Sequence, residues 1–233
     1  MRLRIFTTQC RRVCHPRSDY WAVTRWECAV VIVCIHVQTH PDLTQVVQAF
    51  HDHPEAAVVY GEGWYVGVDG RHIARYPVES FSAENLARRC YICQPAAFLR
   101  REAFAAIGML NAQLRYAHDY DLWIRMARRY PVVKIDKALA TLRVHDDAKT
   151  VKETAAAMRE TFSVLRRHYD YVPYNWIYGY AHHRLDGQPI ATEKPRPALS
   201  SACYSLALGV HYNWRHPFRL CRDIVATARE GLT

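Results

Sequence analysis

Apolar and polar residues are arranged along the chain in a way that predicts strands and helices in turn. Short runs rich in Val, Ile and Ala, bounded by polar or turn residues, are typical of buried strands. Such runs occur at residues 28–37, 56–60, 93–99, 131–135 and 140–144. Alternating residues over 64–68, followed by Asp69-Gly70, predict a β-hairpin that returns through residues 72–74.

Helices are predicted where apolar residues recur every three or four positions. This spacing indicates helices that begin at Pro41-Asp42 and end before Pro54, and at residues 82–88, 101–106, 119–129 and 149–169. Residues 119–129 are apolar on most sides, so we expect that helix to be buried. After Pro173 the chain is rich in Tyr and Trp, and two final helices are expected around residues 200–210 and 217–229.

Interleaved strands and helices predict an α/β fold, and the size and composition agree with this. The 233 residues suffice for one large domain or two small ones. Half of the residues are hydrophobic and 23% are charged, which is ordinary globular composition and excludes a disordered chain.

The net charge of +9 lies at the two ends of the chain. Residues 1–26 hold six arginines and one aspartate, and residues 194–233 hold six basic and two acidic residues. The residues between them, 27–193, are neutral, with 19 of each sign. A neutral central region with basic ends is untypical of a DNA-binding protein, and the sequence contains no recognisable nucleic-acid-binding motif. We therefore expect no nucleic-acid partner. It is compatible with basic ends that meet an anionic membrane leaflet.

The eight cysteines are too few and too irregularly spaced for a disulfide scaffold, and Cys90-x-x-Cys93 has no second pair at zinc-ribbon spacing. We therefore expect reduced thiols. The longest apolar run, residues 28–35, is much shorter than a membrane-spanning helix, and no secretory signal is recognisable. These features predict a cytoplasmic protein.

The stretch HDYDLWIRM, from His118 to Met126, carries the most informative chemistry. Asp119 and Asp121 stand at the start of a helix, where the helix dipole favours their ionised form. Asp119 is also a suitable N-cap residue, which would account for one of the two acids. Capping does not account for the second acid, the neighbouring histidine and the bulky Trp123, so we interpret this stretch as a candidate site with a functional carboxylate.

This stretch belongs to a longer run that resembles a known family. The pieces VVYGE, VDGR, RRCYICQPAAFLRREAF, GMLNAQLRYAHDYDLWIRMA and LRVHDDAKT follow one another over about 90 residues, from Val58 to Thr150. In order and content they resemble the C-terminal half of a bacterial family-2 glycosyltransferase domain. The resemblance implies an incomplete nucleotide-diphospho-sugar transferase (GT-A) fold, a mixed sheet flanked by helices, here with a helical C-terminal extension.

Enzymes of that family move a sugar from a nucleotide-sugar donor to an acceptor hydroxyl with inversion. The resemblance implies that Asp119 is the base that removes the acceptor proton, with His118 in place of the first acid of the family's acidic pair. It implies acceptor-binding roles for Gln94 and Trp123, and for Asp121 a role either in fixing the loop or in reaching the acceptor. From the residues alone, Trp123 is instead expected in the core, because it lies within an apolar helix.

The resemblance also implies a divalent metal, Mn²⁺ or Mg²⁺, that neutralises the leaving diphosphate. His145 stands where some relatives contact the metal or a phosphate, and Lys149 could touch the pyrophosphate of the donor. The alternative for His145 is a solvated histidine in a turn, beside Asp146 and Asp147. The alternative for Lys149 is a surface lysine near the start of a helix.

The N-terminal part departs from the family. The acidic metal motif should follow the strand at residues 28–37, yet residues 28–41 contain no acid at all. His36 and His40 without a carboxylate match a hard cation poorly. We hypothesise that the reading frame is shifted, or the gene degenerate, upstream of about residue 40. The chain is then divided into an atypical segment 1–40, a glycosyltransferase-like domain 41–170 and a helical extension 171–233 that is rich in aromatic and basic residues.

The predicted function is transfer of a sugar from a nucleotide-sugar donor to a glycan or lipid-linked acceptor in surface polysaccharide assembly. The protein is expected to be a truncated member of the family, either active or inactive as an enzyme. The alternative is a non-catalytic remnant that binds an acceptor or a partner in a membrane-associated glycan assembly complex. The C-terminal segment mixes aromatic and aliphatic residues with Arg215, Arg219 and Arg222, which suits an interfacial helix at the inner face of the membrane. The alternative for this segment is a helix packed on the catalytic domain with solvated arginines.

Overall fold

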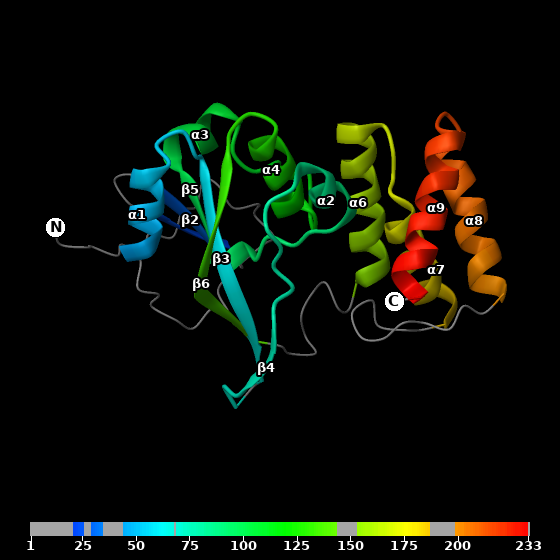
Figure 1. The fold of residues 1–233 in the computed structure, drawn as a ribbon, viewed down its shortest axis with the longest axis horizontal. Helices are drawn as coiled ribbons and strands as arrows, with labels where there is room; N and C mark the ends of the chain where they lie inside the picture. Colours follow the sequence, from blue (N-terminus) through cyan, green and yellow to red (C-terminus); the bar gives the residue numbers. More distant parts are fainter. Residues whose placement is uncertain are drawn as a thin grey trace. The chain divides into compact units, whose positions relative to one another are not determined.

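The structure is a computed structural model that describes residues 21–25, 29–34, 44–67, 69–143, 153–186 and 199–232. The chain divides into two compact units, Met1–Ala148 and Lys149–Thr233. In the described residues the first unit combines a sheet with helices, and the second contains helices alone (Figure 1). The expected mixed α/β class, a mixed sheet flanked by helices, is confirmed at this level.

The first unit is built on a six-stranded mixed sheet in which β1, β2, β5, β3 and β4 follow one another and β6 pairs with β3. Its strands are β1 Trp21–Arg25, β2 Ala29–Cys34, β3 Val58–Val66, β4 His72–Arg75, β5 Ala97–Arg100 and β6 Val132–Arg143. Its helices are α1 Thr44–Asp52, α2 Ala83–Arg88, the 3₁₀ turn η1 Gln94–Ala96, α3 Arg101–Ala106 and α4 His118–Ala127.

The longest strands, β3 and β6, run parallel to each other through the middle of the first unit (Figure 1). Their pairing starts at Val58 opposite Val132 and continues to Val66 opposite Arg143. The register shifts around Glu62, next to Gly61. A Cβ atom on Gly61 would lie 2.5 Å from the carbonyl oxygen of Lys137, so the close approach of the two backbones requires glycine there.

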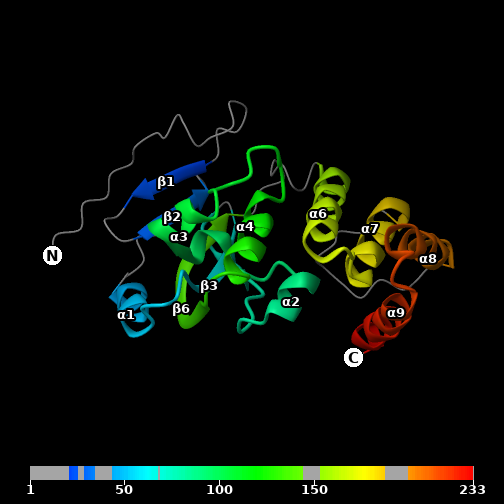
Figure 2. The ribbon, with the colours of Figure 1, turned by 90° about the horizontal axis from the view of Figure 1, so that it is seen from above.

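The two faces of this sheet carry different layers. Figures 1 and 2 show α1 and α4 on opposite sides of β3 and β6. On the α1 side, Val46 and Ala49 pack in one cluster with Val59, Phe98 and other buried residues. Because side chains alternate along a strand, Val58 and Tyr60 point to the other face. The unit therefore has an apolar layer on each side of the sheet.

Several predicted elements are confirmed. β3 and β4 form the expected hairpin, and Gly70 has the positive φ of 80° that its turn requires. Helix α3 has the predicted bounds and is followed by Gly108 at φ 84°. The expectation of two strands at residues 131–135 and 140–144 is wrong, because they form the single strand β6. Asp136 interrupts the apolar pattern, but its side chain is 89% exposed and the backbone pairing continues past it.

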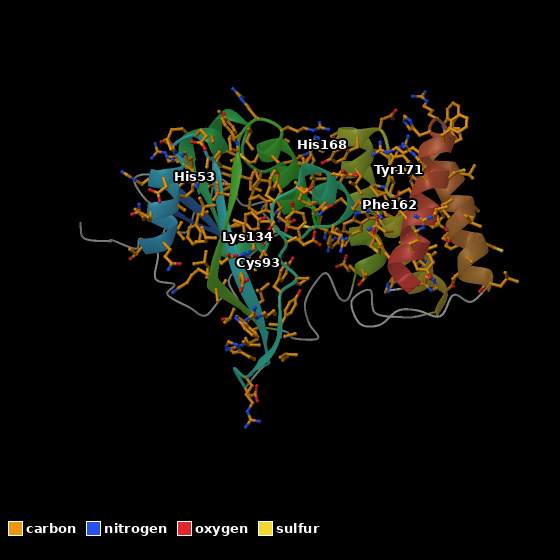
Figure 3. All side chains as sticks on the ribbon, viewed as in Figure 1. His53, Cys93, Lys134, Phe162, His168 and Tyr171 are labelled. Atoms are coloured by element: carbon orange, nitrogen blue, oxygen red, sulfur yellow. The ribbon has the colours of Figure 1, made fainter. Side chains whose placement is uncertain are left out.

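The second unit consists of α6 Thr154–Tyr169, α7 Tyr174–Asp186, α8 Leu199–Asn213 and α9 Pro217–Leu232. The two final helices were predicted, whereas α7 was not, because its aromatic and polar residues show no clear helical periodicity. Phe162 and Tyr171, labelled in Figure 3, belong to its buried core. No helix in the described ranges has the length and apolar character needed to cross a bilayer.

Two polar side chains from the last helices hold the turn between α6 and α7. The side-chain amide of Asn213 pairs with both backbone groups of Val172, accepting from its N–H at 2.8 Å and donating to its carbonyl at 2.9 Å. Asp223 accepts from the backbone N–H of Tyr174 at 2.6 Å and from the hydroxyl of Tyr171 at 3.0 Å. Asp223 thus supplies a cap for the first turn of α7 from another helix.

The side chain of Arg100, at the end of β5, ties the sheet to the segment after α1. Its guanidinium donates to the carbonyl of Ala56 at 2.6 Å and to that of Phe50 at 2.8 Å. It also lies over the Phe50 ring, 4.9 Å from the ring centre. One charged group therefore satisfies carbonyls at the C-terminal end of α1, where the helix dipole is negative.

We expect Arg100→Met to lower the free energy of unfolding of the first unit by about 2 kcal/mol, because it removes hydrogen bonds from a charged donor. Denaturant unfolding followed by circular dichroism measures the change. The neighbouring Arg101 is exposed and serves as the matched control. An Arg100→Met protein as stable as Arg101→Met would contradict this role.

Candidate functional site

Asp119 lies in the first turn of α4. The helix begins at His118 with Ala117 as the N-cap residue, so the suggestion that Asp119 is the N-cap is wrong. Its carboxylate accepts a hydrogen bond from the backbone N–H of Tyr120 at 2.7 Å. The carboxylate is therefore held among the free N–H groups of a helix start, where negative charge is favoured.

Two opposing effects act on the Asp119 carboxyl. Desolvation by burial raises its pKa, whereas the charge of His118 and the hydrogen bonds from backbone N–H groups lower it. Desolvation is the largest of these, so the pKa of Asp119 lies above its ordinary value. A half-buried carboxyl with a raised pKa is typical of groups that accept and release protons in active sites.

The neighbours of Asp119 come from the segments that follow β4 and α2. Burial raises the pKa of the Cys90 thiol and of the Tyr76 hydroxyl well above their ordinary values, and the charge of Asp119 adds to both shifts. The Tyr76 hydroxyl donates to the carbonyl oxygen of Cys90 at 3.4 Å. Both groups stay protonated near neutral pH, so they present hydrogen-bonding groups and no second negative charge.

Beyond Cys90, the chain packs tightly against the sheet. Burial raises the pKa of Cys93 to about 12. A Cβ atom on Gly63 would lie 2.5 Å from the Cys93 sulfur, so this thiol fills the space above a glycine of β3. Cys93 is labelled at the sheet in Figure 3. Cys90, Cys93, Cys203 and Cys221 are free thiols.

Asp121, the second acid of α4, has a different environment from Asp119. It is buried, and its carboxylate accepts from the guanidinium of Arg125 at 2.8 Å. Arg125 in turn donates to the carbonyl oxygens of Ile107 at 2.8 Å and Met109 at 2.7 Å. Asp121 therefore orients an arginine that ties α4 to the turn after α3, where Met109 has a positive φ of 59°.

Tyr120 ties the same helix to α2. Its hydroxyl donates to the carbonyl oxygens of Leu86 at 2.6 Å and Ala87 at 3.1 Å, at the C-terminal end of α2. The segment before α2 is tied to the sheet by Tyr60, whose hydroxyl donates to the carbonyl of Glu79 at 2.7 Å. These contacts fix both sides of the polar cluster, which we define as Tyr76, Cys90, His118 and Asp119.

The other predicted site residues are placed as follows. Trp123 is 1% exposed and lies in the core, so its ring has no open face for a sugar, and its Nε1 has no hydrogen-bond partner among the described residues. Gln94 is half-buried at the start of η1, directly after Cys93. His145 and Lys149 lie outside the described residues.

Sequence reasoning missed Tyr76 and treated Cys90 only as a reduced thiol. Neither stands near Asp119 in the sequence, and no local pattern marks either one. The relation of Tyr76 and Cys90 to Asp119 depends on tertiary structure, because it arises when α2 and α4 pack against each other. The position of Cys90 within the run that resembles a glycosyltransferase was the only available indication.

A divalent cation does not fit the acids that the structure describes. Among the described residues, no group of three or more His, Cys, Asp or Glu side chains is placed to hold a metal ion. Asp121 is engaged by the guanidinium of Arg125. Hard cations require several oxygen ligands, so we derive no catalytic step through a metal.

Comparison with known proteins adds no relative. No model of a known protein family matches the sequence, and no curated protein matches it.

We expect Asp121→Asn to lower the free energy of unfolding of the first unit by about 3 kcal/mol, because it leaves Arg125 partly buried without its counter-charge. Urea unfolding followed by circular dichroism measures this. The double variant Asp121→Asn/Arg125→Met should recover part of the loss. Additive losses in the double variant would contradict a direct coupling between the two side chains.

The raised pKa of Asp119 makes stability depend on pH. Because the unfolded state ionises first, near pH 3.8, the wild-type protein should lose unfolding free energy relative to Asp119→Asn as the pH rises through the folded pKa. Unfolding by urea at a series of pH values measures the difference. Asp136→Asn removes the same charge at an exposed position and is the control. A difference between wild type and Asp119→Asn that is independent of pH would show that the carboxylate is not desolvated.

Proposed function

We propose that this chain is a glycosyltransferase-like protein that transfers a sugar from a nucleotide-sugar donor to an acceptor hydroxyl, with Asp119 as the general base. The observation that carries the proposal is the half-buried Asp119 carboxyl, which has a raised pKa in the first turn of α4. The mixed α/β architecture is compatible with a GT-A domain and is shared by other folds. The run of resembling pieces from Val58 to Thr150 supplies the reaction class.

In the proposed reaction the acceptor oxygen forms a bond to the anomeric carbon while the bond from that carbon to the donor diphosphate breaks. The acceptor proton passes to the Asp119 carboxylate. A raised pKa suits this step, because a base is most effective when its pKa approaches the working pH. Backbone N–H groups at the helix start hold the carboxylate in place before the transfer.

The other members of the polar cluster have supporting roles in this proposal. His118 offsets the charge of Asp119 in its ionised form. Tyr76 and Cys90, whose pKa values the charge of Asp119 raises further, stay protonated and do not compete as nucleophiles. Asp121 acts through Arg125 and positions α4, and Gln94 is the proposed contact to the acceptor. We propose His145 and Lys149 as contacts to the donor phosphates.

The proposed setting is assembly of a surface polysaccharide from glycan or lipid-linked acceptors at the cytoplasmic side of a membrane. The neutral charge of residues 27–193, which contain the whole candidate site, suits a domain that acts on a saccharide and does not bind a polyanion.

Release of nucleoside diphosphate tests the role of Asp119. The full chain is incubated with a panel of uridine, guanosine and thymidine diphospho-sugars, and with isolated bacterial membranes as the source of acceptor. Asp119→Asn should lower the rate at least about 100-fold, because general-base catalysis is lost. Asp136→Asn, at an exposed acid of β6, should leave the rate unchanged. Undiminished turnover by Asp119→Asn would place the base elsewhere.

Titration calorimetry with the same donors, each with and without Mn²⁺, separates transfer from a purely binding role. Heat with a donor in both wild type and Asp119→Asn supports a transferase whose base has been removed. No heat with any donor contradicts the transferase and favours a protein that binds an acceptor or a partner in a glycan assembly complex.

A further inference from the structure

Helix α8 has an inverted distribution of side chains. The residues that it buries are small or polar: Ser201, Ser205, Gly209 and Asn213. Each lies four positions after the one before, so they form one face of the helix. The residues that it exposes are mostly apolar, and they also recur at helical spacing: Leu199, Cys203, Leu206, Ala207 and Val210. A helix on a globular core ordinarily shows the opposite arrangement.

Specific contacts hold the polar face of α8 against the rest of the helical unit. The Ser205 hydroxyl lies 2.7 Å from the Tyr174 hydroxyl and donates to the carbonyl of Ala202. Asn213 makes both of its hydrogen bonds to the backbone of Val172. A Cβ atom on Gly209 would lie 3.4 Å from the Tyr174 ring, so α8 approaches α7 closely there. Rotating the helix to bury its apolar face would break these buried hydrogen bonds.

The exposed apolar residues continue into the turn after α8 and into α9. Trp214, in the turn, is 66% exposed and Phe218, near the start of α9, is 86% exposed. We call the exposed residues Leu199, Cys203, Leu206, Ala207, Val210, Trp214 and Phe218 the apolar stripe. Tryptophan and phenylalanine are the side chains that enter the interface of a bilayer most readily.

The charges beside the apolar stripe are mostly positive. Arg215, Arg219 and Arg222 are exposed around the turn and the first turns of α9. Among the described residues of α8 and α9 the acids are Asp223 and Glu230, and Asp223 is buried against Tyr171 and Tyr174. One exposed acid from another segment, Asp170, lies 3.1 Å from His216 in the same turn, so an anionic surface meets three exposed arginines against this one acid.

We propose that the apolar stripe docks on an anionic lipid surface, with Trp214 and Phe218 inserted among the lipids and the arginines at the head groups. The charge complementarity selects a lipid surface over a second copy of this chain, whose own stripe would bring the same arginines together. This proposal does not depend on the proposed sugar transfer.

Co-sedimentation of the full chain with vesicles tests the proposal. Binding to phosphatidylcholine mixed with phosphatidylglycerol should exceed binding to phosphatidylcholine alone, and it should weaken as salt is added. Trp214→Ser/Phe218→Ser should lower the partition coefficient at least about tenfold. Arg215→Gln/Arg222→Gln should lower it about fivefold for each arginine. Ile73→Ser removes a 63% exposed side chain from β4 and is the matched control, which should bind like wild type.

All the substituted residues are exposed, and circular dichroism checks that each variant keeps its helical content. Equal pelleting of wild type and Trp214→Ser/Phe218→Ser would overturn the proposal, as would equal binding to neutral and anionic vesicles. Light scattering in the absence of lipid measures the oligomeric state and tests the alternative that a second copy of the chain covers the stripe. A wild-type dimer that becomes a monomer in Trp214→Ser/Phe218→Ser would show that a second copy covers the stripe and would also overturn the proposal.

Discussion

The parallel pairing of β3 with β6 is the constraint on which the first unit depends. β3 pairs with β5 and β6 along its first half and with β4 and β6 along its second, so three of the other five strands pair with it directly. Because α4 leads directly into β6, this pairing also fixes the C-terminal end of α4. Tyr120 and Arg125 then fix its rotation, through carbonyls of α2 and of the turn after α3. The position of Asp119 follows from these three restraints together.

The two acids of α4 show how burial alone does not decide the role of a carboxylate. Asp121 is buried with the guanidinium of Arg125 at hydrogen-bonding distance, so its charge is compensated and its carboxylate serves a structural role. Asp119 has only backbone N–H groups and a histidine to offset its desolvation, so its proton affinity rises. Two identical side chains within one helical turn thus separate into one that holds the structure and one that is chemically available.

The local sequence pattern was sufficient to predict elements whose structure is determined by neighbouring residues in the chain. Asp69-Gly70 predicted a hairpin, because its turn requires a positive φ that the sequence marks with glycine. It failed where tertiary contacts dominate: β6 continues past Asp136 because its backbone is paired, and α7 is buried by its aromatic residues without an amphipathic pattern. For the site, the helix that carries Asp119 was predictable. Tyr76 and Cys90 were not, because the charge of Asp119 affects their pKa values only through the packing of segments that are distant in the sequence.

The cap that Asp223 provides to α7 has a consequence for the order in which the second unit can be completed. On the ribosome, α7 emerges before α9, so its first turn stays uncapped until residue 223 has been synthesised. The turn at Val172 likewise waits for Asn213. The helical unit therefore closes only after α9 has been synthesised, and any shortened version that ends before α9 would carry a frayed α7 and an exposed Tyr171.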